Sequence, residues 1–198
     1  SLDGPIRPLD IFDKSAFGPD FEEAPWVYKR KGIYYMIYAS DPTESLHYTT
    51  AKKIKGPWNY GNLLMPPTGN SGSNHPAIVD YKGNSYLFYH TGELPGGDDF
   101  NRSVCVEQFY YNNDGSIPAI KKTREGVLKS VGKLYPFKRV EAETMAWSEG
   151  LKLNESDEIG VYVTSIHDND HVKIRDVDFG EGGVSAFEAN VASRYFGG

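Results

Sequence analysis

The chain has 198 residues, a formal net charge of −6 at pH 7 and 14% aromatic residues. Its lysines and arginines are scattered, and no apolar run approaches the ~18–20 residues that span a bilayer, so neither nucleic acid nor a membrane is an expected partner. A single cysteine, Cys105, excludes an internal disulfide framework.

Two copies of a β-hairpin pattern dominate the first half of the chain. In each copy, runs of aromatic and aliphatic residues flank a Lys-Gly turn, and one more strand-like run follows. Gly32 of the first turn and Gly83 of the second are 51 residues apart, and at the same offset Pro25 matches Pro76. The predicted strands are residues 26–29, 33–38 and 46–50 in the first copy, and residues 77–80, 85–89 and 104–109 in the second.

A repeat of about 50 residues that contains a hairpin and further strands is typical of one blade of a β-propeller. The alternative is chance similarity, because any hairpin uses glycine and aromatic residues. After Gly126 the repeat ends, and short strands between glycine turns favour a β-sandwich. The strands predicted in this last region are residues 161–164, 171–174 and 184–191.

We therefore predict an all-β chain with a boundary near residue 137. Residues 1–137 are predicted to be the C-terminal blades of a propeller, and residues 138–198 the first part of a β-sandwich of the jelly-roll type. Propellers have at least ~4 blades, and a sandwich needs about 100 residues. We accordingly expect the chain to begin inside a propeller and to end inside a sandwich.

The residues just before the shared proline are the best candidates for chemistry, because the inner strands of propeller blades begin near the central axis. The 51-residue offset pairs Glu23 with Asn74, which is followed by His75, while strand alternation turns Glu22 to the opposite side. A carboxyl that is desolvated beside aromatic residues such as Trp26 is suited to give a proton to a glycosidic oxygen.

Each candidate also has a simpler structural interpretation. Carboxylates are seldom buried, so Glu23 is also explained as a solvated carboxylate at a strand end. His75 is also explained as a hydrogen-bonded structural histidine. Arg102, which precedes a predicted strand, suits a sugar hydroxyl or a carboxylate, but taken alone it is better explained as a surface charge.

Three segments, in order, resemble glycoside hydrolase family 43, and together they cover about residues 20–126. The first resembles the segment around the general acid of that family, the second a later blade, and the third the strand and turn that follow it. These segments are Phe21-Glu22-Glu23-Ala24-Pro25-Trp26 with Gly32-Ile33-Tyr34-Tyr35, Asn74-His75-Pro76-Ala77-Ile78-Val79 with Tyr86-Leu87-Phe88-Tyr89-His90, and Arg102-Ser103-Val104 with Asn113-Asp114-Gly115.

The resemblance implies a five-bladed propeller and inverting hydrolysis of arabinofuranosyl or xylosyl linkages in arabinoxylan, arabinan or xylo-oligosaccharides. It makes Glu23 the general acid, and it implies that Trp26, Asn74 and Arg102 bind substrate. It also makes His75 a ligand of calcium near the central axis, directly or through water. The expected partner is then a plant cell-wall polysaccharide or oligosaccharide, and the expected location is extracellular or at the cell surface.

An inverting glycosidase also needs a second carboxyl, ~6.5–9.5 Å from the acid, with a water between them. None of the aspartates that precede Glu23 matches the base motif of the family. We therefore expect the base to lie before residue 1 and the chain alone to be inactive. These aspartates are Asp3, Asp10, Asp13 and Asp20.

The last third of the chain resembles the start of carbohydrate-binding module family 6, which is a β-sandwich. The resemblance begins at residues 139–143 and includes residues 170–174 and 177–180. It implies that Glu141 and Glu143 help to hold a structural calcium ion, for which carboxylate oxygens are suited. The alternative for the whole chain is a non-catalytic propeller and sandwich protein that binds a glycan or another protein.

Overall fold

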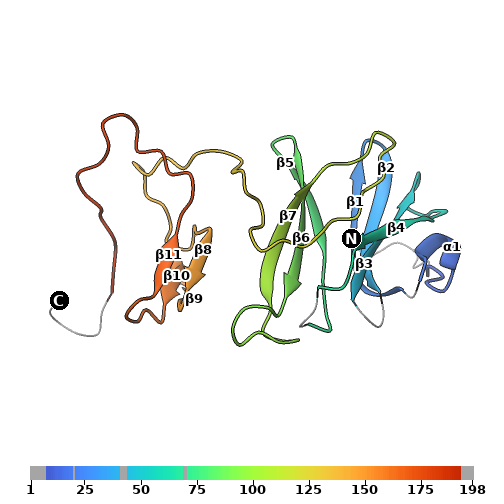
Figure 1. Cartoon of the computed structure of the whole chain (residues 1–198), viewed down its shortest axis with the longest axis horizontal. Coiled ribbons are helices and arrows are strands. Elements are labelled where there is room, and N and C mark those ends of the chain that lie inside the picture. Colours follow the sequence, from blue (N-terminus) through green and yellow to red (C-terminus); the bar gives the residue numbers. More distant parts are fainter. Residues whose placement is uncertain (1–7, 20, 41–43, 69–70, 193–198) are drawn as a thin grey trace. The chain divides into compact units, whose positions relative to one another are not determined.

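The computed structural model describes residues 8–19, 21–40, 44–68 and 71–192, so Asp3 and Asp20 lie outside the described residues. The chain forms two compact units, Ser1–Leu128 and Lys129–Gly198 (Figure 1). The boundary predicted near residue 137 falls inside the second unit, and the division into two domains stays a prediction. The described part contains one short helix, α1 (Lys14–Phe17), and no described helix is long and apolar enough to cross a membrane.

The first unit consists of two antiparallel sheets in which strands that are consecutive in the sequence lie side by side. The strand order is β1-β2-β3-β4 in one sheet and β5-β6-β7 in the other. The all-β prediction is confirmed. The strands are β1 (Phe21–Arg30), β2 (Ile33–Ser40), β3 (Ser45–Ala51), β4 (Asn59–Met65), β5 (Ala77–Tyr81), β6 (Asn84–Thr91) and β7 (Ser103–Phe109).

The repeat seen in the sequence is present in the two hairpin turns. Each turn has two residues, and Lys31, Gly32, Lys82 and Gly83 all have positive φ angles, of 46°, 85°, 48° and 81°. Two consecutive positive φ angles define the type I′ turn, whose twist matches that of the flanking strands. A Cβ atom at either glycine would meet nothing within 4 Å, so backbone conformation rather than lack of space favours glycine there.

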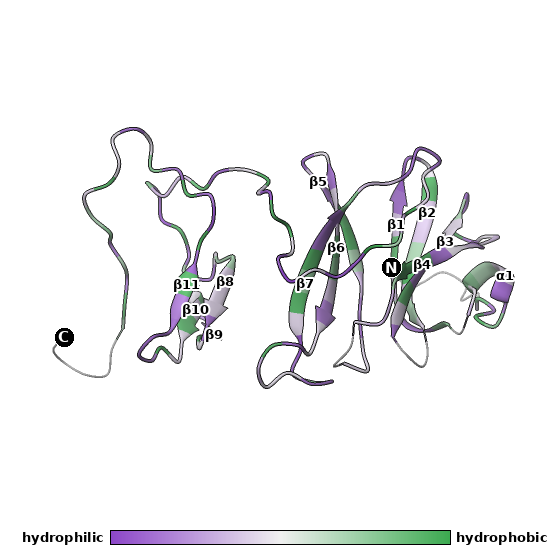
Figure 2. Cartoon of the chain, viewed as in Figure 1, coloured by the Kyte–Doolittle hydropathy of each residue, from purple (hydrophilic) through white to green (hydrophobic). Residues whose placement is uncertain are grey.

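One apolar core joins the two sheets of the first unit. The hydrophobic stretches of β2, β6 and β7 that form part of it are visible in Figure 2. The segment after β7 returns to this core, where Ile120 donates its backbone N–H to the carbonyl of Leu64 at 2.7 Å. The buried residues are Tyr35, Ile37, Ala39, Leu46, Tyr48, Leu64, Met65, Ile78, Leu87, Tyr89, Phe109, Ile117 and Ile120.

One strand of the first unit was not predicted. β4 contains Asn59, Gly61 and Asn62, residue types that are depleted in strands, so its sequence shows little β propensity. It forms because β3 offers a free edge and because Leu64 and Met65 enter the shared core. Tertiary packing thus overrides local preference at this strand.

The second unit has four short strands in two separate pairs, β9 with β10 and β8 with β11. The predicted strands at residues 161–164 and 171–174 are present. The predicted strand at residues 184–191 is wrong, because this segment pairs with no described strand and its apolar side chains are exposed, Phe187 to 91%. The four strands are β8 (Trp147–Glu149), β9 (Lys152–Ser156), β10 (Gly160–Thr164) and β11 (His171–Lys173).

We expect the replacement Leu87→Ala to lower the free energy of unfolding by about 2–5 kcal/mol, because it removes a fully buried side chain from the core that joins the sheets. Leu128→Ala is the matched control, since Leu128 is 73% exposed and its replacement should change stability by less than about 0.5 kcal/mol. Urea denaturation of both variants measures the difference. Equal losses in the two variants would contradict the assignment of the core.

His47 on β3 makes the stability of the first unit dependent on pH. The ring is buried between the hydroxyl groups of Ser45 and Tyr60, which lie 3.0 and 2.8 Å from its nitrogens, and it stacks on Tyr38. Burial lowers the pKa of His47 in the folded state, so the unfolded chain binds a proton at a higher pH than the folded chain does. The stabilising effect of neutral His47 is therefore complete above about pH 6.5 and is lost as the pH falls below it.

We expect the free energy of unfolding to fall more steeply between pH 7.5 and pH 5 in the wild-type protein than in a His47→Asn variant. Urea titrations across this range measure both slopes, and the variant controls for all other titrating groups. Identical slopes would mean that His47 does not contribute to the pH dependence.

Candidate active site

Glu23 lies in an irregular part of β1. The pairing with β2 shifts register twice, between Phe21 and Glu23 and again between Glu23 and Trp26, and Ala24 has a φ angle of 56°. Such bulges re-aim side chains and are frequent next to active sites. They also remove the regular alternation that we used to place Glu22 on the opposite side of the strand.

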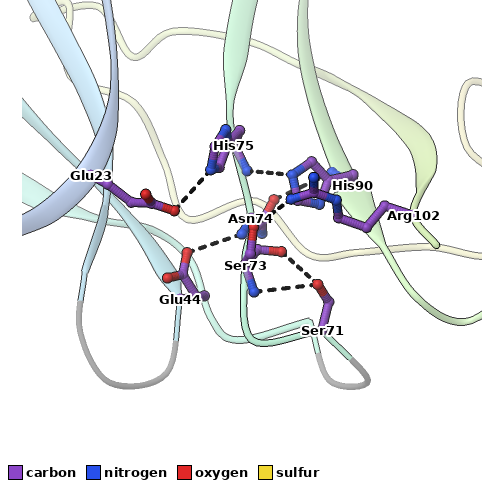
Figure 3. A network of polar contacts seen from close by, with 8 residues as sticks. All are labelled: Glu23, Glu44, Ser71, Ser73, Asn74, His75, His90 and Arg102. Carbon is purple, nitrogen blue, oxygen red and sulfur yellow. Dashed lines mark hydrogen bonds and ion pairs between the residues drawn. The ribbon is translucent and has the colours of Figure 1, made fainter. Parts of the chain in front are cut away.

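Glu23 and His75 meet between the two sheets of the first unit (Figure 3). Oε1 of Glu23 lies 2.8 Å from Nε2 of His75. The two side chains are 47% and 49% exposed, so the desolvation expected for Glu23 is not seen in this chain. Half exposure leaves the carboxyl open to a ligand on one side, while His75 holds it on the other.

Trp26 does not shield Glu23 in the expected way. Its indole Nε1–H donates to the backbone carbonyl of Ile78 at 3.1 Å, and this contact ties β1 to β5. Four residues along β1, Arg30 forms an ion pair with Asp80 at 2.9 Å. Trp26 is thus part of the contact between the sheets, and its role in substrate binding stays a prediction.

Asn74 lies beneath this surface, with only 1% of the residue exposed. Its Oδ1 accepts the backbone N–H of His90 at 3.3 Å, and the backbone N–H of His75 donates to Nε2 of His90 at 3.0 Å. Because Nε2 accepts a hydrogen bond, the neutral ring of His90 carries its proton on Nδ1. Burial, together with the positive charge of Arg102, lowers the pKa of His90 and favours this neutral form.

Two polar atoms next to this network are buried without a hydrogen-bond partner among the described residues. They are Nδ2 of Asn74 and Nδ1 of His90. Both are donors in the arrangement above, so each can bind an oxygen atom of a water or a ligand. The role of Asn74 in substrate binding stays a prediction.

Arg102 reaches the same group of residues from the start of β7. Its guanidinium donates to Oγ of Ser73 at 2.7 Å (Figure 3). The remaining N–H groups of an arginine can bind a sugar hydroxyl or a carboxylate. The structure therefore brings Glu23, His75 and Arg102 to one place, although the roles assigned to them stay predictions.

Sequence reasoning missed two members of the network, His90 and Glu44. The ring of His90 packs 5.4 Å from that of His75, and Oε2 of Glu44 accepts the backbone N–H of Asn74 at 2.9 Å. His90 lies one residue before the end of β6, the strand that follows the second hairpin turn, which is a weak signal for a site. Glu44 follows Asp41-Pro42-Thr43 in the sequence and resembles an ordinary surface charge there.

The described side chains do not fit a calcium site on their own. No group of three or more His, Cys, Asp or Glu side chains that could hold a metal is found among the residues that the structure describes. Calcium takes six to eight oxygen ligands, whereas Nε2 of His75 already bonds Glu23. In the second unit, Glu141 pairs with Arg139 at 3.0 Å, which competes with a cation for that carboxylate. The calcium roles of His75, Glu141 and Glu143 stay predictions.

Comparison with known proteins shows similarity over most of the chain. The sequence model described as "Glycosyl hydrolases family 43" matches residues 6–117. An arabinoxylan arabinofuranohydrolase of Paenibacillus polymyxa is 29% identical over 194 residues, which cover 86% of this chain and 30% of the relative. One from Bacillus subtilis is 33% identical over 189 residues, which cover 84% and 37%.

A solved structure is similar over the same extent. It is a family 43 arabinoxylan arabinofuranohydrolase from Bacillus subtilis in complex with cellotetraose, with 29% identity and a TM-score of 0.72. The match covers 82% of this chain and 38% of that chain, so it extends beyond the first unit. The chain thus spans roughly a third of the length of these relatives.

We expect Trp26→Phe to lower the free energy of unfolding by about 1 kcal/mol, because it removes the only hydrogen bond described for the indole and leaves the carbonyl of Ile78 without that donor. Trp147→Phe, at an exposed tryptophan of the second unit, is the control and should have little effect. Thermal or urea denaturation measures both. A loss that is no larger for Trp26 than for Trp147 would show that this contact does not stabilise the first unit.

Proposed function

The chain belongs to glycosyl hydrolase family 43, and on that premise we propose that it carries part of the active site of an inverting glycoside hydrolase. The proposed reaction is the release of arabinofuranosyl units from arabinoxylan or its oligosaccharides. The observation that carries this proposal is the contact between Glu23 and His75, which holds a half-exposed carboxyl at the meeting point of two sheets within the matched residues.

In the proposed mechanism Glu23 is the general acid. Its carboxyl gives a proton to the glycosidic oxygen of the leaving sugar as the bond to the anomeric carbon breaks. A second carboxylate, which no described residue is assigned to provide, takes a proton from the water that attacks the opposite face of the sugar. Inversion follows because bond formation and bond breaking occur on opposite faces.

The neighbours of Glu23 have separate parts in this mechanism. His75 orients the carboxyl through their 2.8 Å contact, and Arg102, held by Ser73, binds a hydroxyl of the sugar. Trp26 and Asn74 are proposed to line the same pocket. Support comes from the convergence of these residues and from the names of the relatives, two of which are arabinoxylan arabinofuranohydrolases.

The finer architecture is part of the same proposal. The two sheets of consecutive antiparallel strands are interpreted as blades of a five-bladed propeller. The second unit is interpreted as the beginning of a family 6 carbohydrate-binding module, a β-sandwich. Support for the second point is that similarity to the solved relative extends beyond the first unit.

The setting of the proposed reaction follows from its substrate. A plant cell-wall polysaccharide cannot enter a cell intact, so the protein is proposed to act outside the cell or at its surface. Calcium is proposed only as a structural ion, with most of its ligands supplied by groups other than the described side chains, and no step of the mechanism needs it.

We expect Glu23→Gln in the full-length protein to reduce kcat on arabinoxylan about 10²–10⁴-fold, because the amide cannot donate the proton that the leaving sugar needs. An aryl arabinofuranoside with a good leaving group should be affected much less, since its departure needs little protonation. Reducing-sugar release and aryl-group release measure the two reactions.

The matched control is Glu155→Gln, at an exposed carboxylate on β9 of the second unit, which should leave both rates unchanged. Thermal denaturation checks that each variant is folded. Full turnover of arabinoxylan by the Glu23→Gln variant would overturn the assignment of Glu23 as the general acid. If the wild-type protein binds glycans without hydrolysing them, the non-catalytic alternative is supported instead.

A further inference from the structure

Glu44 is a buried carboxylate that the proposed mechanism does not use. It precedes β3, only 5% of the residue is exposed, and its φ angle is 52°. Glutamate is almost never this buried unless it is paired, and its backbone seldom adopts the left-handed region. A residue that is both buried and strained persists only where the surrounding structure holds it, which is common at functional sites.

The partner of Glu44 is a backbone group of the segment that precedes the other sheet. Its Oε2 accepts the N–H of Asn74 at 2.9 Å (Figure 3). Among the residues that the structure describes, no Lys or Arg forms an ion pair with it. The carboxylate therefore acts through this hydrogen bond, of the charge-assisted kind that is roughly twice as strong as a neutral one.

Glu23 and Glu44 together hold two consecutive residues. Glu23 lies on β1 and Glu44 directly precedes β3 of the same sheet. They contact His75 and Asn74, which precede β5 of the second sheet. Glu44 holds the backbone at residue 74, and Glu23 holds the side chain at residue 75. His90 completes the restraint, because its backbone N–H donates to Oδ1 of Asn74 and its ring accepts the N–H of His75.

The pKa of Glu44 also reflects the charge of the proposed acid. Burial is the largest effect and raises the pKa of Glu44. The negative charges of Glu22 and Glu23 also raise this pKa, whereas the hydrogen bond from Asn74 and the charge of His75 lower it. Glu44 thus feels the charges of both members of the Glu23–His75 pair.

We propose that Glu44 is a positioning residue: by anchoring the backbone N–H of Asn74 it aligns the imidazole of His75 with the carboxyl of Glu23. This proposal rests on the proposed function of Glu23 as the general acid. Loss of the Glu44 carboxylate frees the segment before β5, so His75 no longer holds Glu23 in the orientation that protonates the leaving sugar. Arg102 is bound to Oγ of Ser73, one residue before Asn74, so its substrate contacts should weaken by a smaller factor than the proton transfer does.

The test compares Glu44→Ala, Glu44→Gln and Glu44→Asp in the full-length protein on arabinoxylan. Glu44→Ala and Glu44→Asp should reduce kcat about 10–100-fold with a clearly smaller change in KM, because the acceptor is absent or withdrawn by one methylene. Glu44→Gln keeps an acceptor oxygen for the N–H of Asn74 and should recover most of kcat. Equal losses in Glu44→Ala and Glu44→Gln, or no loss in Glu44→Ala, would overturn the proposal.

Glu107→Ala is the control for stability alone. Glu107 is also 5% exposed, and it accepts hydrogen bonds from Tyr89 and from the backbone and hydroxyl of Thr123, so its loss also disrupts a buried carboxylate. This variant should lose thermal stability but keep kcat. If Glu44→Ala does not fold, the contrast between Glu44→Asp and Glu44→Gln decides the question.

A measurement without substrate separates this proposal from the proposed function. The ¹⁵N signals of the His75 imidazole, assigned by their loss in His75→Gln, should move in Glu44→Ala and stay in place in Glu44→Gln and Glu107→Ala. If these signals move while the wild-type protein hydrolyses no arabinoxylan, Glu44 positions His75 and the proposed reaction is wrong. If hydrolysis occurs and the signals do not move in Glu44→Ala, Glu44 is not a positioning residue.

Discussion

The candidate site depends on the packing of one sheet of the first unit against the other through a single apolar core. That core brings β1 alongside β5, where polar contacts connect the strands at the indole of Trp26 and at the ion pair between Arg30 and Asp80. The contact between Glu23 and His75 lies at the end of the same row of contacts. Any change in how the sheets pack would therefore move these two side chains relative to each other.

Buried carboxylates reinforce this packing at two places. Glu44, which precedes β3 of the first sheet, accepts a backbone N–H that precedes the second sheet. Glu107 of the second sheet accepts groups of Thr123 in the segment that returns to the core. A buried carboxylate costs energy unless its oxygens are hydrogen-bonded, so each of them specifies one position for the segment that it binds. At both places a carboxylate side chain accepts a backbone N–H that does not take part in a β-sheet hydrogen bond.

The chemistry of the site follows from unequal exposure of its members. Glu23 and His75 are half exposed and can meet a ligand, whereas Asn74 and Glu44 beneath them are almost completely buried. The exposed pair thus rests on a rigid, hydrogen-bonded layer. Such preorganisation is what a proton donor needs if it is to stay aligned with a leaving oxygen.

The sequence by itself determined the hairpins and the offset of 51 residues, because strand alternation and type I′ turns depend on residues that are neighbours in the chain. It also determined the family, through motifs of adjacent residues. It also placed Glu23 and Asn74 at equivalent positions of a repeat, with His75 next to Asn74. Only the tertiary structure decided the bulges around Glu23, the bond of Trp26 to β5 and the burial of Glu44, since each depends on atoms that are far away in the chain. The same reason explains the missed β4 and the absent strand at residues 184–191. A strand forms only where it can pair with the edge of another strand and bury its apolar side chains in a core.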